Sequence, residues 1–241
     1  VGHPRVALSL LDDPELVLDP GAKLGERHLP NLDEASAARL HDFALAASDV
    51  AQLASPLDLD IWGQLLEESD PDTPLSQWPV IWNGWPEDIG LSSQTLCVER
   101  LDEHRLQLTK SIRIASETNP EVLDFLEIHL PAVADSSSSR RTRNEVQALL
   151  VPDRAQILGL LRQYGDAIEA RDQARAEYLD LCEHIDEAVF DAFEMPDDLR
   201  QIVRRRMSEF PLNENANNPR LPWEPTRKPK IKVFEPGDRY H

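Results

Sequence analysis

The sequence predicts a mainly α protein with a small β hairpin, an α+β class whose C-terminal half is a long helical hairpin or coiled-coil-like structure. Two observations lead to this fold class. Apolar residues recur at alternating intervals of four and three over residues 157–192, and a clear apolar–polar alternation occurs in residues 96–114. With 241 residues and 41% hydrophobic content, the chain can bury one large core or two small ones.

The N-terminal third predicts two helices after a stretch broken by proline and glycine. Asn31 or Asp33 can cap the first helix, which ends before Pro56. Its apolar face is formed by Leu40, Phe43, Ala44, Ala47, Val50 and Ala51. A shorter helix over residues 57–68 turns Ile61, Leu65 and Leu66 inward.

A Trp- and Pro-rich segment follows and leads into the hairpin. Trp78, Trp82 and Trp85 lie close together in sequence and form a candidate partner-docking or base-stacking patch. The alternative is a loop packed on its own core, which is the more frequent use of such a cluster. Alternating apolar residues on both sides of the turn at 102–105 then predict the hairpin.

Four parts follow from these patterns. Residues 1–133 form an acidic α+β region with the Trp/Pro-rich loop, and residues 134–143 are a Ser/Arg linker. Residues 144–212 form a helical region, and the Asn- and Pro-rich residues 213–241 form an extended basic tail.

The long helical pattern has an apolar seam with two exceptions. Nine of its eleven positions between 157 and 192 are apolar, tyrosine or cysteine, while Arg171 and Arg175 lie in the middle. The helix is therefore bent there or paired with acidic residues of a neighbour. Pro196 interrupts the pattern, and a second helix that begins near Asp197 is expected to carry Leu199, Ile202, Val203 and Met207 inward.

The formal charge of −19 is unevenly distributed. Residues 200–241 carry ten Lys or Arg and five Asp or Glu, a net +5, so residues 1–199 carry 15 basic and 39 acidic residues, a net −24. Between residues 40 and 99 eleven acidic residues occur without a Lys or Arg. Phosphate binding by that segment is therefore not expected.

Catalytic and cofactor motifs are absent from the sequence. It contains no Gly-x-Gly, no Gly-x-Ser-x-Gly, no Asp/Glu-x-Lys and no Pro-Pro. We therefore expect no catalytic residue, metal or cofactor in this chain. Cys97 and Cys182 form no disulfide framework, and no apolar run is long enough for a membrane span, so we expect a cytoplasmic protein without membrane contact.

Clusters of basic residues are the candidates for DNA contact, because they are positively charged in a chain whose net charge is negative. The proposed phosphate-binding residues are Arg204, Arg205, Arg206, Lys228, Lys230 and Lys232, together with Arg140, Arg141 and Arg143 of the linker. The alternative for each run is a solvated surface or an intramolecular partner for acidic residues.

One segment resembles a known family. The helix that contains Ile185, Asp186, Val189, Phe190 and Phe193, followed by a short turn and a second helix, resembles the C-terminal helical segment of large adenine-specific DNA methyltransferases. These include single-chain type II restriction-modification enzymes and the methyltransferases of BREX-like phage-defence systems. The resemblance covers about residues 145–207, and Glu194 and Met195 stand where that family has a glycine turn.

The resemblance implies a non-catalytic, target-recognition-associated part of a DNA-modifying enzyme. The catalytic domain, with S-adenosylmethionine, would belong to another part of a longer polypeptide, of which this chain without an initiator methionine is a fragment. DNA would contact the basic C-terminal region, and the acidic face would lie away from DNA or against another protein.

Two other classes fit the residues. The acidic segment 40–99 could imitate a row of phosphates, which would make the chain a DNA mimic or an acidic protein-interaction module. The seam of residues 157–192 could instead pair with a partner helix, which would make the chain a helical scaffold subunit.

Overall fold

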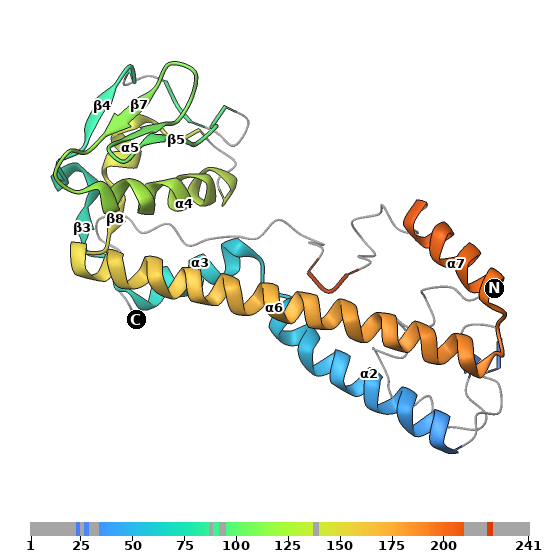
Figure 1. Ribbon diagram of the computed structural model, residues 1–241. Helices are drawn as coiled ribbons and strands as arrows, with labels where there is room; N and C mark the ends of the chain where they lie inside the picture. The colour runs from blue at the N-terminus through green and yellow to red at the C-terminus, as the bar shows by residue number, and fades with distance from the viewer. Residues whose placement is uncertain are drawn as a thin grey trace. The chain divides into compact units, whose positions relative to one another are not determined.

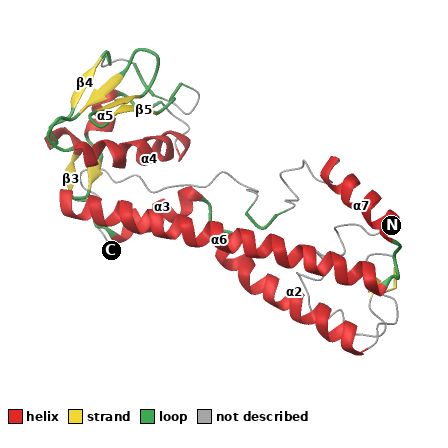
Figure 2. Cartoon of the chain, in the orientation of Figure 1, coloured by secondary structure: helices red, strands yellow, loops and turns green. Residues whose placement is uncertain are grey.

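The computed structural model describes residues 23–24, 27–28, 34–86, 89–91, 95–136, 140–209 and 221–223. For residues 23–28 in this set, and for 135–136 and 206–209, only the backbone course is described. The basic tail, with Lys228, Lys230 and Lys232, lies outside the described residues. Figure 2 shows that helices dominate the described part, which confirms the mainly α, α+β fold class.

The chain forms two compact units, each made from two stretches of sequence. The helical unit comprises Val1–Pro56 and Glu169–Thr226, and the sheet unit comprises Leu57–Ile168 and Arg227–His241. Helix α6 (Arg154–Ala192) contributes residues to both units (Figure 1). Residues 134–143 lie inside the sheet unit, and the limits of the two units fall near residues 56 and 168.

The helical unit is an antiparallel hairpin formed by α2 (Glu34–Ala54) and the second half of α6. Phe43 stacks on His184 at 5.4 Å between ring centroids, while the later residue Ala54 contacts the earlier residue Arg175. The buried side chains between the helices are mostly small on the α2 side: Leu40, Ala44, Ala47 and Ala54 face Ala174, Tyr178, Ile185, Ala188 and Val189. Alanine at these positions lets the helix backbones approach closely.

The predicted seam of α6 is confirmed, because all eleven of its positions are buried or half-buried. The two arginines in the seam are accommodated in different ways. Arg171 is 7% exposed and pairs with Asp172 at 2.7 Å. Arg175 donates from Nε to the Ala54 carbonyl oxygen at 3.0 Å and from Nη2 to the Pro56 carbonyl oxygen at 3.1 Å. Arg175 thus caps the C-terminus of α2 with a side chain from another helix.

Helix α6 ends in a turn that requires a left-handed residue. Glu194 has φ of 47°, its N–H donates to Asp191 O at 2.9 Å, and the Met195 N–H donates to Phe190 O at 2.9 Å. These two bonds form the helix-terminating arrangement in which glycine is the usual left-handed residue. Glu194 therefore adopts, without being glycine, a backbone conformation that glycine favours.

Helix α7 (Asp197–Glu209) presents its charged side to α6. Arg200 contacts Asp191 at 2.8 Å and Glu187 at 3.4 Å. Leu199 and Ile202 are 47% and 57% exposed, so the prediction that these two point inward is wrong. Val203 is half-buried, and the side chain of Met207 lies outside the described residues. The reason is that ion pairs with acidic residues of α6 hold the opposite side of α7 against the unit.

The sheet unit contains a four-stranded antiparallel sheet in the order β4-β7-β6-β5. Its strands are β4 (Ile81–Asn83), β5 (Glu99–Asp102), β6 (Arg105–Gln107) and β7 (Arg113–Ala115). The predicted hairpin is confirmed as β5–β6, and two further strands extend it. Helix α4 (Pro120–Ser136) packs under the sheet (Figure 1).

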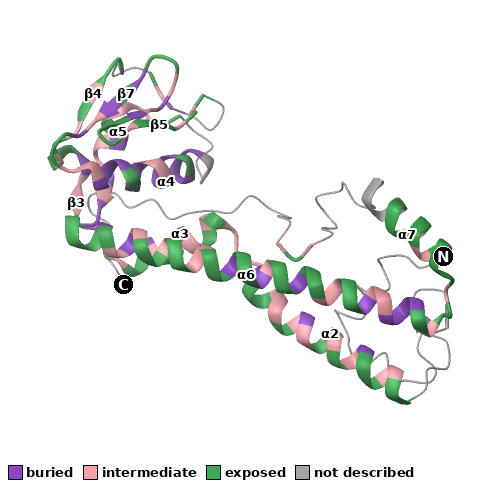
Figure 3. Ribbon diagram, viewed as in Figure 1, coloured by how far each residue is buried: buried purple, intermediate pink, exposed green. Residues whose placement is uncertain are grey.

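The remaining elements of the sheet unit complete a single core. These elements are α3 (Asp58–Glu68), β3 (Thr73–Pro74), the 3-10 turn η2 (Leu75–Gln77), α5 (Arg143–Gln147), β8 (Leu150–Val151) and the first part of α6. Trp62 of α3 is fully buried and donates from Nε1 to His129 Nδ1 at 3.2 Å, and burial lowers the pKa of His129 to about 4. Figure 3 shows buried residues concentrated on α4.

Candidate nucleic-acid interface

The four-stranded sheet has one buried face and one open face. Its strand register places Trp82, Ile114, Leu106 and Arg100 in one row across the sheet. Ile114 and Leu106 are fully buried, and Arg100 contacts Asp124 of α4 at 2.9 Å. This row faces α4, so the residues that alternate with it point to the opposite side of the sheet.

The open face carries a continuous line of hydrogen-bonding side chains, which we call the polar row. The register joins Asn83 of β4 to Arg113 of β7, Arg113 to Gln107 of β6, and Gln107 to Glu99 of β5. Asn83, Arg113 and Glu99 are exposed, and Gln107 is half-buried. Directly paired residues project to the same face, so all four side chains lie side by side.

The polar row is free of intramolecular competition among the described residues. No hydrogen bond or ion pair within that part of the chain involves the side chains of Asn83, Arg113, Gln107 or Glu99. Arg113 and Glu99 have opposite charges, but Gln107 separates them by one strand. The row therefore presents donors and acceptors that a ligand can use without displacing a partner within the described chain.

A second row of the open face is more apolar, and its two charged residues form an ion pair with each other. It contains Ile81, Ala115, Arg105 and Asp102 in register. Ile81 is 53% exposed. Arg105 donates from Nε to Asp102 Oδ2 at 2.6 Å, so its charge is balanced within the sheet.

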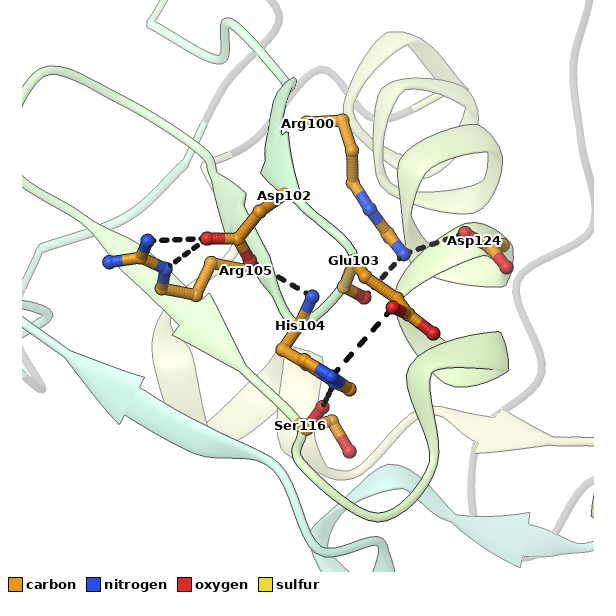
Figure 4. A network of polar contacts seen from close by, with 7 residues as sticks. All are labelled: Arg100, Asp102, Glu103, His104, Arg105, Ser116 and Asp124. Atoms are coloured by element: carbon orange, nitrogen blue, oxygen red, sulfur yellow. Dashed lines mark hydrogen bonds and ion pairs between the residues drawn. The ribbon is translucent and has the colours of Figure 1, made fainter.

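The β5–β6 turn is organised around Asp102 (Figure 4). Besides Arg105, the His104 N–H donates to Asp102 Oδ1 at 3.0 Å. The hydrogen bond from Arg105, and to a smaller extent the one from His104, lowers the pKa of Asp102 below its ordinary value and so favours the ionised carboxylate. His104 Nδ1 lies 3.2 Å from the Ser116 carbonyl oxygen, which ties the turn to the end of β7.

The β6–β7 turn places a lysine beside the polar row. Lys110 is exposed in this turn. Thr109 Oγ1 accepts from the Ile112 N–H at 3.1 Å, which fixes the turn next to Arg113. On the neighbouring strand end, Gly84 has φ of 72°, and a Cβ there would lie 2.3 Å from the Ser111 carbonyl oxygen. Glycine therefore allows the β4 end and this turn to pack together.

The basic residues predicted on α7 are partly engaged within the helical unit. Arg204 forms an ion pair with Glu187, and its guanidinium lies 6.0 Å from the centre of the Phe190 ring. Arg205 is exposed, and only the backbone of Arg206 is described. The structure thus gives Arg204 an intramolecular partner, one of the two alternatives for this run.

The linker arginines occupy different positions in the sheet unit. Arg140 is exposed. Arg141 pairs through its backbone with Leu91, at 2.7 and 2.9 Å for the two N–H to O bonds. Arg143 donates from Nη1 to the Trp85 carbonyl oxygen at 3.1 Å. Arg141 and Arg143 therefore hold neighbouring loops together.

The three tryptophans pack on the core of the sheet unit. Trp85 is 3% exposed and donates from Nε1 to the Ile89 carbonyl oxygen at 2.6 Å, so it offers no surface to a partner. Trp82 lies 5.5 Å from Trp85 between ring centroids, and Trp78 is half-buried against the core. The arrangement corresponds to the second reading of this cluster, a loop packed on its own core.

Other kinds of site receive no support in the described part of the chain. It contains no group of three or more His, Cys, Asp or Glu residues that could hold a metal ion. None of its helices combines the length and apolar character needed to cross a bilayer. Comparison with known proteins yields no match to a family model, a curated protein or a solved structure.

The polar row was missed by the sequence reasoning, although part of its signal is present. Arg105-Leu106-Gln107 and Arg113-Ile114-Ala115 each alternate polar and apolar residues, which predicts one open face. Asn83, however, joins the row through pairing between β4 and β7, about thirty residues apart in sequence. The row can exchange hydrogen bonds with a polar ligand, and it contains no nucleophile paired with a base.

Proposed function

We propose that this chain is the non-catalytic, target-recognition-associated part of a cytoplasmic DNA-modifying enzyme of the adenine methyltransferase type. The observation that carries the proposal is the polar row, a set of Asn, Arg, Gln and Glu side chains beside Lys110 that have no hydrogen-bond or ion-pair partner among the described residues. These residue types recognise base edges and phosphates, whereas they form no catalytic constellation here.

The local electrostatics support DNA as the ligand despite the acidic chain. Arg113 and Lys110 lie at the same end of the open face, and neither has an ion pair among the described residues. Arg105 is compensated by Asp102, and Glu99 offsets one of the two cations, so the polar row and Lys110 together carry a net charge of +1. A local excess of positive charge on a chain of net charge −19 is a place where phosphate can approach with less repulsion than over the acidic segments.

The turn between α6 and α7 supports the enzyme class. The methyltransferase segment that the chain resembles has glycine at this turn, and Glu194 adopts the left-handed conformation that glycine favours. The substitution therefore keeps the backbone path that the resemblance implies. The catalytic domain, and the S-adenosylmethionine that such a domain binds, would belong to another part of the enzyme.

The arginines of α7 would make secondary DNA contacts. Arg204 and Arg205 are both exposed, and Arg204 would have to exchange Glu187 for a phosphate. An exposed ion pair is worth only about 0–1 kcal/mol, so such an exchange costs little. Lys228, Lys230 and Lys232 of the tail, together with Arg206 and the exposed Arg140, would add further phosphate contacts.

The experiment is a fluorescence-anisotropy titration of a mixed-sequence DNA duplex with the full chain at several salt concentrations. We expect binding at low salt that weakens as salt rises, with a slope of about −2 to −4 in log K against log salt, because two to four phosphates are neutralised. The variant Lys110→Glu should weaken binding, while Arg162→Glu on the exposed surface of α6 is the matched control. No binding at low salt would contradict the proposal.

A helical scaffold is the second candidate function, and one observation favours it. Phe193, Leu199 and Ile202 are 52%, 47% and 57% exposed around the α6–α7 turn. Exposed apolar side chains that are near one another in sequence are candidates for a protein contact. Light scattering tests this function: an oligomer that Ile202→Glu dissociates would support it, and a monomer that binds DNA would leave the first proposal as the better one.

A further inference from the structure

We propose that the β6–β7 hairpin enters the major groove of duplex DNA and that Arg113 and Gln107 read base edges there. This inference rests on the proposed function and deepens it, because it names the groove and the residues that would determine sequence preference. The evidence is the register of the polar row, its exposure and the lack of competing partners within the part of the chain that the structure describes.

The dimensions of the hairpin fit the groove. Adjacent strands lie about 4.8 Å apart, so the four-residue polar row spans roughly 14 Å. The major groove of B-form DNA is about 12 Å wide and admits a two-stranded β ribbon. The full row is therefore slightly wider than the groove, so we expect the face of the central strands β6 and β7 to lie over the groove and Asn83 and Glu99 on the outer strands to lie at its edges.

The chemistry of the two central side chains suits base recognition. The Arg113 guanidinium can donate two parallel hydrogen bonds to O6 and N7 of guanine. The Gln107 amide can donate to N7 and accept from N6 of adenine. Because Arg113 and Gln107 are adjacent across the two strands, they would contact neighbouring base pairs.

Lys110 gives the hairpin an orientation on the duplex. It lies in the turn that joins β6 to β7, three residues before Arg113 along the chain. A lysine at the tip of the hairpin reaches a phosphate at the groove rim, where it adds affinity without sequence information. Glu99 pairs with Gln107 on the outer strand β5, and where its carboxylate meets a base edge it can accept from N4 of cytosine.

Other nucleic acids fit this face less well. The outward-facing residues of its four strands include no aromatic side chain, so the described face lacks the stacking platform on which single strands are bound. Duplex RNA has a deep and narrow major groove that side chains cannot read. The open face therefore favours duplex DNA over both alternatives.

The test is a selection of bound sequences from a randomised DNA duplex library with the full chain and three variants. Arg113→Lys keeps the charge but loses the paired donors, Arg113→Ala loses both, and Arg162→Ala removes an arginine from the exposed side of α6. We expect the wild-type chain and Arg162→Ala to select a guanine that both Arg113 variants no longer select. The loss of preference at that position should be roughly tenfold to a hundredfold.

The outcomes separate the inference from the proposed function. If Arg113→Lys selects the same guanine as the wild-type chain, or if the wild-type chain binds duplex DNA without sequence preference, the inference is overturned while DNA binding stands. If single-stranded DNA or duplex RNA competes as well as duplex DNA, groove reading is also overturned. If no duplex is bound at low salt, the proposed function itself fails.

Discussion

The two units of this protein are stabilised by different kinds of buried side chain. The sheet unit buries large apolar groups completely, among them Trp62, Phe125 and Leu123. The helical unit buries smaller side chains, and five of the nine residues in its core are alanines. Each unit also buries one charged side chain among the described residues, Glu121 at 5% exposed in the sheet unit and Arg171 at 7% in the helical unit. We therefore expect truncation of a core side chain to cost more in the sheet unit, and we expect the helical unit to depend more on Arg175, which caps α2.

The largest expected effect is the loss of the central tryptophan of the sheet unit. Trp62→Ala should lower the free energy of unfolding of that unit by about 3–5 kcal/mol, because it opens a cavity and leaves His129 Nδ1 without its donor. Chemical denaturation measures the loss, and hydrogen exchange assigns it to residues of one unit.

The matched control for this prediction is Leu53→Ala. Leu53 is 67% exposed, so its truncation should change the free energy of unfolding by less than about 0.5 kcal/mol. If Trp62→Ala destabilises α2 and the second half of α6 as strongly as the sheet, the two units unfold as one, and the comparison between them fails.

The second largest expected effect is the loss of Arg175, which tests the stability of the helical unit. Arg175→Ala should lower its free energy of unfolding by about 2 kcal/mol, because the carbonyl oxygens of Ala54 and Pro56 lose a charged donor. Hydrogen exchange should show the last turn of α2 opening first. Arg162→Ala, which removes an exposed arginine from the sheet unit, is the control, and an equal loss in both variants would contradict the capping role.

The smallest effect depends on pH. Burial, followed by the charges of Glu187 and Glu183, raises the pKa of Asp186 to about 6. A raised pKa means that the folded state binds the proton more tightly than the unfolded state, so this stabilisation is present at low pH and is lost as pH rises through about 6. Asp186→Asn should therefore stabilise the helical unit by roughly 1–2 kcal/mol at pH 8 and by little at pH 4.

Thermal unfolding across this pH range provides the measurement, with Asp49→Asn on the exposed side of α2 as the control. The control should show no such change between pH 4 and pH 8. A stabilisation by Asp186→Asn that is equal at both pH values would show that its carboxyl is not penalised by burial.

The sequence predicts long repeating patterns better than short elements. The seam of α6 repeats over eleven positions, and all of them are buried or half-buried. Strand β4 has three residues and β3 and β8 have two each, too few for an alternation to be recognised. These strands form because distant partners supply their hydrogen bonds, so local sequence gives little indication of them.

A side chain that pairs with backbone atoms cannot be assigned its partner from the sequence. Arg175 was expected to imply a bend or an acidic neighbour, but it pairs with two carbonyl oxygens, which every sequence contains. The inward side of α7 was misassigned for a related reason. Its apolar residues indicate one buried side, yet Arg200 and its partners on α6 determine the side that packs.

The candidate site could be predicted only in part. Alternation around Leu106 and Ile114 predicts that Arg105, Gln107 and Arg113 share an open face. The order of strands, and hence the neighbours of Arg113, follows from pairing across the sheet. Arg204 is a second residue whose surroundings the sequence does not predict. Its charge is evident in the sequence, but its ion pair with Glu187 is not.

The divided sequence of the helical unit has a consequence for synthesis on the ribosome. Helix α2 ends at Ala54, but its partner stretch in that unit begins at Glu169. At synthesis rates of about 5–20 residues per second, the apolar side of α2 waits roughly 6–23 seconds for its partner to emerge. During that interval the apolar side of α2 is exposed, because the residues of α6 that cover it have not yet been made.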